Sequence, residues 1–334
     1  MTKKEIVRNT INHKQSEVVP YHIEFTKEAH DNAAAYYDDP DFESKLGNCL
    51  LGFSTQPEGA WTEIKSGHWQ DQFGVVWDQT VDKDIGVPVN VLVTAENVDS
   101  FEFPDPDDPS RYAHYDARMK ERPDLYPKSD IGFSLYERAW TLAGMENLLM
   151  AMMTDRPFVD RLFDRITEYN LAIIKNCMEF DIDGMGFGDD WGQQHGLLFG
   201  GELWRDLIKP RIAQMYAAVK EAGKSVFIHS CGKVDEIFPD LIEVGLDVFN
   251  PFQPEVIDPF EIKEQFGDKL TFFGGISTQK TLPYATPEET RKEVEKLLEK
   301  VGRNGGYIAA PAHATPADAR PENIAAMIDV LKNQ

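Results

Sequence analysis

The sequence is poor in cysteine and has no long run of apolar residues. Its three cysteines, Cys49, Cys177 and Cys231, are odd in number and lie far apart in the 334-residue chain, which argues against the disulfide framework of a secreted protein. No apolar run approaches the roughly 20 residues of a membrane span, and the first residues lead into an amphipathic segment without a signal-type core. We therefore expect reduced thiols and a cytoplasmic location.

Basic residues are scarce as well. The chain has 57 acidic and 34 basic residues, which gives a formal net charge of −23. Such a charge repels the phosphate backbone of nucleic acids and anionic lipids, so we expect neither nucleic acid nor a membrane as a partner. Hydrophobic residues make up 42% of the chain and charged residues 27%, which is typical of a folded globular protein.

Nucleotide-binding motifs are also absent. Gly274-Gly275-Ile276-Ser277 is a short turn after a strand and not a GxGxxG sequence, and no Walker A sequence occurs. After residue 128, apolar strand-like runs alternate with helical patterns instead. The runs are residues 131–135, 184–187, 225–229, 247–251, 270–275 and 306–310.

This alternation predicts an α/β fold with a parallel sheet. The number of units favours a (β/α)8 TIM barrel that residues 1–334 form as a single domain. A helix over residues 3–14 and a first strand over residues 18–25 open the chain. Residues 26–128 look irregular, and we interpret them as a long N-terminal excursion that covers one end of the barrel. A surface insertion without function fits the same residues.

The run at residues 225–229 ends in His229-Ser230-Cys231. In an extended chain the side chains of residues i and i+2 leave the same face, so His229 and Cys231 should point together beyond the strand end. An imidazole nitrogen and a thiolate are typical ligands of zinc. On these residues alone, a core cysteine beside a hydrogen-bonded histidine fits equally well.

Polar residues follow other predicted strands too. Asp189 and Asp190 follow the second run, Glu255 follows the fourth and His313 follows the last. In a barrel of this class the carboxyl ends of the strands form the mouth in which the chemistry takes place. Two alternatives stay open, because an aspartate after a strand often caps a helix or turn and Glu255 fits a solvated loop charge.

A catalytic zinc site uses three protein ligands and one open position, whereas a structural site uses four and is usually rich in thiolates. The chain has three cysteines and no CxxC sequence, which favours the catalytic type. We predict His229, Cys231 and His313 as the metal ligands. The reserve candidates are His195, Asp189 and Glu255.

Several short segments taken together carry a resemblance to a known family. They are residues 3–24, Asp71–Trp77, Gly188–Gly192, His229–Gly232, Phe273–Ile276, and Thr315-Pro316 with Pro321–Ile324. Over nearly its full length the chain resembles the uroporphyrinogen decarboxylase superfamily, and more closely its corrinoid-dependent methyltransferase branch. The resemblance implies a (β/α)8 barrel and suggests a homodimer.

The sequence departs from the family pattern in two places. The decarboxylases resemble one another in an arginine-rich segment after the first strand that holds the substrate carboxylates, whereas this chain has Glu24-Phe25-Thr26-Lys27-Glu28 there. A highly anionic tetrapyrrole would be repelled by that segment. The zinc methyltransferases have a distant cysteine near the last strand, and His313 takes what looks like its place. Histidine is an adequate zinc ligand.

The resemblance implies zinc-dependent methyl transfer between a small substrate and a corrinoid carried by a separate protein. One thiolate with two histidines leaves a metal more electrophilic than a thiolate-rich set does, which favours demethylation of a methoxylated aromatic. A thiol acceptor with the same zinc site is the first alternative, and a metal-free decarboxylase is the second.

Further residues are assigned roles within this hypothesis. Asp189 and Asp190 would protonate or orient the leaving group. Aromatic residues near the predicted mouth would stack on a substrate ring, or else belong to the core. The predicted substrate-binding residues are Trp191, Gln253, Glu255 and Tyr136, and the other candidate aromatics are Trp61, Trp69, Trp77, Trp140 and Phe252.

Overall fold

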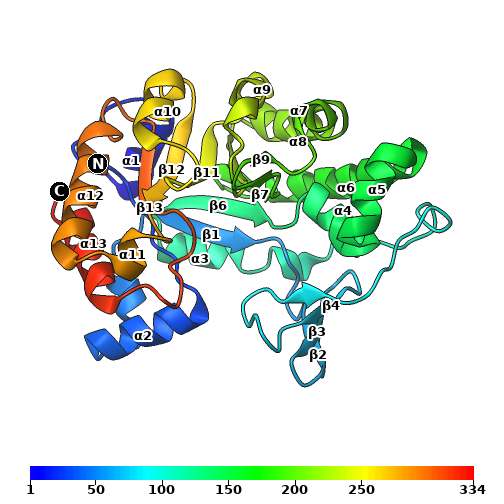
Figure 1. Cartoon of the computed structure of the whole chain (residues 1–334), viewed down its shortest axis with the longest axis horizontal. Helices are drawn as coiled ribbons and strands as arrows, with labels where there is room; N and C mark the ends of the chain where they lie inside the picture. The colour runs from blue at the N-terminus through cyan, green and yellow to red at the C-terminus, as the bar shows by residue number, and fades with distance from the viewer.

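The computed structural model describes residues 1–334, and its centre is a parallel sheet of seven strands in the order β1-β6-β7-β10-β11-β12-β13. The sheet curls into a half-barrel, with the two chain termini on the same side of the molecule (Figure 1). Both the α/β class and the parallel sheet are therefore confirmed. The strands are β1 (Leu50–Ser54), β6 (Tyr126–Ile131), β7 (Gly184–Gly188), β10 (Ser225–His229), β11 (Val248–Phe252), β12 (Thr271–Ile276) and β13 (Tyr307–Pro311).

The predicted first strand over residues 18–25 does not form a regular strand. It is reduced to two isolated bridges, Tyr21 with Ala309 and Phe25 with Thr315. The reason is that the side chain of Asn48 takes over the backbone groups of Ile23, whose N–H and C=O bond to its amide at 2.9 Å each. This segment nevertheless bonds to both sides of the gap between β13 and β1, because His22 N donates to Ala309 O and Cys49 N donates to Tyr21 O, each at 3.0 Å.

The later strands lie close to their predicted positions, and β10 has the predicted bounds. The predicted strand at residues 131–135 is wrong, because β6 ends at Ile131. The sequence of β6 is Tyr126-Pro127-Lys128-Ser129-Asp130-Ile131, which is too polar to be predicted as a barrel strand. Lys128 and Asp130 are polar because they line a cavity inside the sheet. Strand β1 lies in the stretch that looked irregular.

Helices cover the outer face of the sheet (Figure 1). Within α6 (Arg156–Cys177), an apolar stripe of Phe158, Leu162, Ile166, Ile173 and Cys177 is buried at helical spacing, so Cys177 is a core residue. Nine further helices are α1 (Lys3–Ile11), α5 (Met145–Thr154), α7 (Gly201–Leu203), α8 (Lys209–Glu221), α9 (Phe238–Glu243), α10 (Pro259–Phe266), α11 (Thr281–Tyr284), α12 (Pro287–Lys300) and α13 (Pro321–Lys332). None of the helices combines the length and the apolar character needed to cross a membrane.

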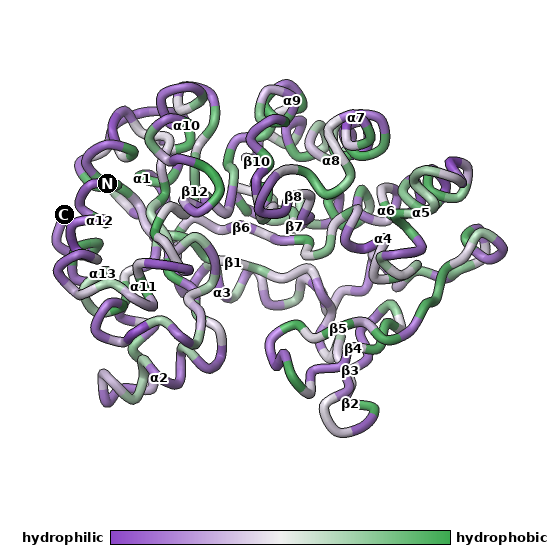
Figure 2. Tube along the Cα trace, in the orientation of Figure 1, coloured by the Kyte–Doolittle hydropathy of each residue, from purple (hydrophilic) through white to green (hydrophobic).

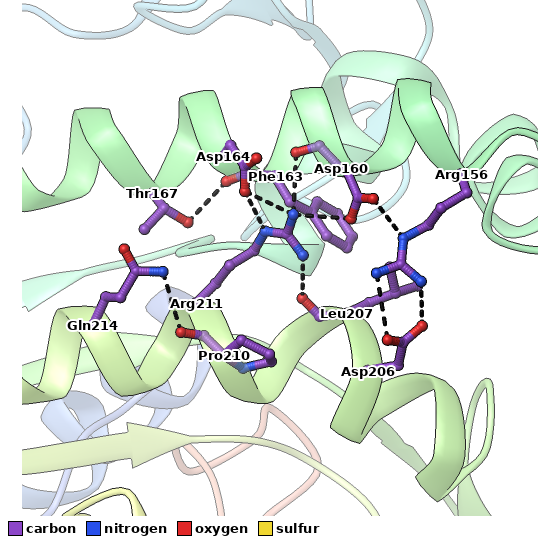
Figure 3. Close-up of polar contacts among 10 residues, drawn as sticks. All are labelled: Arg156, Asp160, Phe163, Asp164, Thr167, Asp206, Leu207, Pro210, Arg211 and Gln214. Carbon is purple, nitrogen blue, oxygen red and sulfur yellow. Dashed lines mark hydrogen bonds and ion pairs between the residues drawn. The ribbon is translucent and has the colours of Figure 1, made fainter.

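A buried arginine on α8 fixes this helix against α6 (Figure 3). Arg211 donates from Nε to Asp164 at 2.8 Å and from a terminal nitrogen to the carbonyl of Leu207 at 2.8 Å. Its guanidinium also pairs with Asp160 at 3.0 Å. Because a buried charge is tolerated only when it is paired and hydrogen-bonded, this network specifies how α8, which leads into β10, sits on α6.

The N-terminal excursion is more regular than its sequence predicts. It contains α2 (Lys27–Tyr37), α3 (Tyr115–Glu121) and a small antiparallel sheet of β2 (Thr62–Lys65), β3 (His68–Gln70), β4 (Val76–Asp78) and β5 (Val87–Pro88). Asp71, which is 7% exposed, organises the turn before β4 by accepting from Phe73 N and Val75 N. It also pairs with the buried Arg138 of α4 (Tyr136–Ala143) at 3.2 Å, which ties the small sheet to this helix.

Candidate metal site and its cavities

The three predicted metal ligands come together in the structure. His229 ends β10, Cys231 lies two residues further, and His313 lies two residues after β13. Their ligand atoms all lie within 4.8 Å of one another. Cys231 Sγ is 3.4 Å from His229 Nε2, and the rings of His229 and His313 have centroids 5.4 Å apart. The expected convergence of this nitrogen, sulfur and nitrogen set is therefore present.

A neighbouring asparagine orients His229. Asn250 on β11 donates from Nδ2 to the carbonyl of Phe273 at 3.0 Å, which places its Oδ1 2.6 Å from His229 Nδ1. An amide oxygen can only accept, so Nδ1 carries the proton and the lone pair of Nε2 faces Cys231 and His313. Sequence analysis missed Asn250, because nothing in the segment Asn250-Pro251-Phe252 distinguishes a ligand-orienting amide from a strand-end residue.

We expect Asn250→Ala to weaken zinc binding by about 10- to 100-fold, as loss of a partner that orients a metal-bound histidine typically does. Competition with a chromophoric chelator would measure the affinity. Circular dichroism would show whether the fold is retained. An affinity within about twofold of wild type would mean that Asn250 does not hold the ring of His229.

The loop that carries Cys231 is fixed by two neighbouring loops. Cys231 N donates to Asp190 Oδ1 at 2.7 Å, and Gly232 N donates to Gln253 Oε1 at 2.6 Å. Gly192 allows this close approach, because a Cβ there would lie 2.5 Å from the carbonyl oxygen of Cys231. The loops after β7, β10 and β11 thus hold the thiol in place.

The surroundings of the site favour the neutral form of His313 and the protonated thiol of Cys231. Burial, followed by the charge of Asp190, raises the pKa of the Cys231 thiol. Desolvation by the surrounding protein, followed by His229 beside it, lowers the pKa of His313. A bound metal cation would stabilise the thiolate that burial disfavours. The donor set of two imidazoles and one thiolate fits zinc.

An outer cavity of about 530 Å³ opens at the carboxyl ends of the strands and includes His229 and His313 in its wall. Part of the wall comes from the excursion, so the excursion does cover this part of the mouth as expected. Two of the predicted aromatics, Trp77 and Trp140, line the cavity. The apolar wall consists of Trp77, Ile85, Ile131, Phe133, Trp140 and Phe187.

Four carboxyl groups also line the outer cavity, those of Asp82, Asp130, Glu137 and Asp190. Burial, followed by the neighbouring charges of Asp190 and Asp189, raises the pKa of Glu137 well above its usual value. A carboxyl group of this kind can hold a proton near neutral pH and deliver it to a leaving group. Sequence analysis missed Glu137, because the misplaced strand at residues 131–135 obscured the helix start on which it lies.

A smaller inner cavity of about 240 Å³ shares Asp130, His229 and His313 with the outer one. Its wall contains a His22–Glu24 pair at 3.1 Å and a Lys128–Asp130 pair. The hydrogen bond from His22 is the main reason why the pKa of Glu24 is lowered to about 2. The glutamate-bearing segment that departs from the family pattern therefore places a carboxylate inside the half-barrel.

Asp189 has a different position from the predicted one. It is fully buried, and its carboxylate accepts from Glu137 N at 2.8 Å, Tyr136 N at 3.1 Å and Trp191 Nε1 at 2.6 Å. Burial raises its pKa to about 6. Because it bonds to the first turn of α4 and lines neither cavity, we assign Asp189 to positioning this helix, and its predicted catalytic role has no cavity contact to support it.

The four predicted substrate-binding residues line neither cavity. Trp191 and Tyr136 are buried, Trp191 against Trp204 and Tyr136 against Phe199. Both are therefore core residues. Gln253 supports the Cys231 loop, and Glu255 accepts from Ser277 beside α12. Of the other candidates, Phe252 stacks on Phe272 in the core, and His195 is exposed in the turn between β8 (Gly192–Gln193) and β9 (Gly196–Leu197).

Comparisons with known proteins place the chain in a family context. Residues 132–334 match the family model described as uroporphyrinogen decarboxylase (URO-D). The uroporphyrinogen decarboxylase of Chlorobaculum tepidum is 25% identical over 254 residues, 71% of this chain and 69% of that protein. The corresponding protein of Chloroherpeton thalassium is 24% identical over 257 residues, 72% of this chain and 69% of that protein.

Among solved structures, a methyltransferase from Methanosarcina mazei has a similar fold. The two align with a TM-score of 0.73 over 99% of this chain and 98% of that one, at 15% sequence identity. The TM-score and coverage show that the fold is shared over nearly the whole chain, and at this low identity they show the fold alone.

Proposed function

The chain belongs to the uroporphyrinogen decarboxylase family, and from this premise we propose that it is a zinc-dependent methyltransferase. In the proposed reaction the methyl C–O bond of a methoxylated aromatic breaks and the methyl group passes to a reduced corrinoid on a separate protein. The ether oxygen keeps the bonding electrons and takes up a proton. The products are a phenol and a methylated corrinoid.

The observation that carries the proposal is the set of His229, Cys231 and His313 beside an aromatic-lined cavity. Zinc held by these residues would supply Lewis acidity at the ether oxygen. The structural similarity to the Methanosarcina mazei methyltransferase supports methyl transfer as the reaction type. Three protein ligands leave an open position for a substrate atom, as in catalytic zinc sites.

The other cavity residues have roles in this proposal that follow from their chemistry. Phe133 and Trp140, which are partly exposed, form a wall on which an aromatic ring can stack, with the buried Trp77 packed behind Phe133. Glu137 holds the proton that the departing oxygen requires, since its pKa is raised. Asp190 accepts from the backbone of Cys231 and so keeps the thiol aimed at the site.

Two alternatives remain within the same framework. A thiol acceptor would use the same three ligands, and the direction of transfer would then be reversed. A metal-free decarboxylase is suggested by the relatives' names, but the carboxylates of Asp82, Asp130 and Asp190 in the outer cavity and of Glu24 in the inner one disfavour a substrate with several carboxylates.

The proposal is tested by incubating the zinc-loaded protein with cob(I)alamin and a series of methoxylated benzenes under anaerobic conditions. Formation of methylcobalamin with release of the matching phenol supports ether demethylation. Methylation of a thiol by methylcobalamin, without ether cleavage, would support the thiol alternative. Carbon dioxide release from a carboxylate by metal-free protein would contradict the proposal.

Zinc binding should release close to one proton per site at slightly alkaline pH. The pKa of the free Cys231 thiol is raised, so the metal must displace its proton, while the pKa of His313 is lowered and its ring has none to give. Affinity should therefore rise about tenfold per pH unit between about pH 7.5 and 9. Calorimetry in buffers of different ionisation enthalpy measures the released proton, and a pH-independent affinity would contradict a thiolate ligand.

A further inference from the structure

The inner cavity exists because one strand of the half-barrel presents glycine to the interior. Layers of side chains normally fill a barrel of this class. Along β7, however, every second residue is a glycine, and Gly184 and Gly186 pair with Lys128 and Asp130 of β6. A Cβ at Gly186 would collide with the carboxylate of Asp130. The glycines thus leave room for the polar residues of β6, which is a hydrophilic stretch in the middle of the molecule (Figure 2).

The carboxylates of this cavity face its open space, whereas the cations beside them are covered. The side chains of Glu24 and Asp130 are 71% and 40% exposed, although both lie in the cavity wall inside the half-barrel. Their partners His22 and Lys128 are only 13% and 14% exposed. Lys128 lies over the ring of Phe227, with its Nζ 5.4 Å from the ring centre. A ligand in the cavity therefore meets carboxylate oxygens first.

A partly exposed aromatic ring, that of Phe273, lies in the same wall. Carboxylates together with an aromatic ring bind organic ammonium groups, through an ion pair and a cation–π contact. His229 and His313 line both this cavity and the outer one, so a single ligand can occupy both cavities while it contacts the metal. The inner cavity, at about 240 Å³, is smaller than the roughly 300–1,000 Å³ of a complete ligand pocket. It therefore fits one end of a substrate.

We propose that the inner cavity binds a protonated amine at one end of the substrate, an inference that rests on the proposed function. The substrates are then methoxylated aromatics with a short aminoalkyl chain ortho to the ether, because the chain has to pass the metal ligands that line both cavities. The ring lies in the outer cavity, and the ammonium group pairs with Glu24 and Asp130. A carboxylate in the place of the amine would be repelled by the same two side chains.

The first test measures binding and needs no turnover. Calorimetry on the zinc-loaded protein, without a corrinoid, would compare ortho-methoxyphenethylamine, ortho-methoxyphenethyl alcohol and ortho-methoxyphenylacetate, which differ only in the group at the chain end. We expect the amine to bind at least about tenfold more tightly than the alcohol, as a charge-assisted hydrogen bond implies, and the carboxylate to bind most weakly.

Three variants locate the effect. Glu24→Gln removes the charge but keeps the shape of the side chain, and it should remove most of the preference for the amine. Gly52→Val should do the same by filling the cavity, because Gly52 lines it and a Cβ there meets no atom within 4 Å. The matched control is Glu28→Gln, which removes an exposed carboxylate outside both cavities. Its affinities should stay within about twofold of wild type.

Turnover with cob(I)alamin separates this inference from the proposed function. An amine that is bound preferentially and demethylated with the highest kcat/KM supports both. An amine that binds no better than the alcohol, or a preference that persists in Glu24→Gln and Gly52→Val, would overturn the amine site. Demethylation of the carboxylate or the alcohol in preference to the amine would overturn it too, while leaving the methyltransferase activity in place. Preferential binding of the amine without demethylation of any of the three compounds would instead overturn the proposed function and support the amine site.

Discussion

Replacing Cys231 with alanine is expected to reduce methyl transfer from a methoxylated aromatic to cob(I)alamin by at least about a thousandfold, because a catalytic zinc site does not retain its metal or its charge balance without its one thiolate. The side chain is only partly buried, so the free energy of unfolding of the metal-free protein should change little. Anaerobic turnover, followed by the absorbance of methylcobalamin, measures the effect.

Cys49→Ala is the matched control for this substitution. Cys49 is 5% exposed and lies beside Tyr21, away from the three ligands. Its replacement removes a thiol of the same kind but no ligand, so activity per folded chain should stay within about twofold of wild type. Full activity of the Cys231 variant would remove the thiolate from the account.

The second large effect is expected at Asp189, and it concerns stability. Asp189→Ala leaves the N–H groups of Leu135, Tyr136 and Glu137 and the indole of Trp191 without their acceptor in the interior. Each buried unsatisfied donor costs about 1–3 kcal/mol, and rearrangement recovers part of this, so we expect a loss of about 3–5 kcal/mol in the free energy of unfolding. Urea denaturation of the metal-free protein measures it.

The neighbouring Asp190 provides the comparison. Asp190 accepts one backbone hydrogen bond, from Cys231, so Asp190→Ala should cost only about 1 kcal/mol. The principal effect of that variant should be weaker zinc binding, since the backbone of a ligand loses its support. Equal stability losses in the two variants would contradict the assignment of Asp189 to the start of α4.

The sequence predicted the metal ligands well, because their positions follow from the two-residue periodicity of a strand and from the place where each strand ends. His229 and Cys231 converge because alternate residues of an extended chain share a face, and His313 joins them because the ends of parallel strands meet at one edge. The run Ser225–His229 is apolar enough to mark its own strand. Strand β6 was not predicted, because its inward-facing residues Lys128 and Asp130 are polar and line the inner cavity.

The residues around the ligands were predicted less well, because their roles depend on contacts between segments far apart in the chain. Asn250 orients His229 from the neighbouring strand, and Glu137 reaches the cavity from a helix start fixed by Asp189. Trp77 lines the cavity because the excursion folds over the mouth, whereas Trp191 lies in the core against Trp204. No spacing along the sequence encodes these contacts.

Zinc content is the measurement that tests the central claim most directly. Plasma mass spectrometry on protein purified without a metal-affinity tag would compare wild type with Cys231→Ala, His313→Ala and Cys49→Ala. The account predicts about one zinc per chain in wild type and in Cys49→Ala, and loss of the metal in the other two variants. A wild-type protein that holds no zinc, even after reconstitution, would contradict the metal site and favour the metal-free decarboxylase.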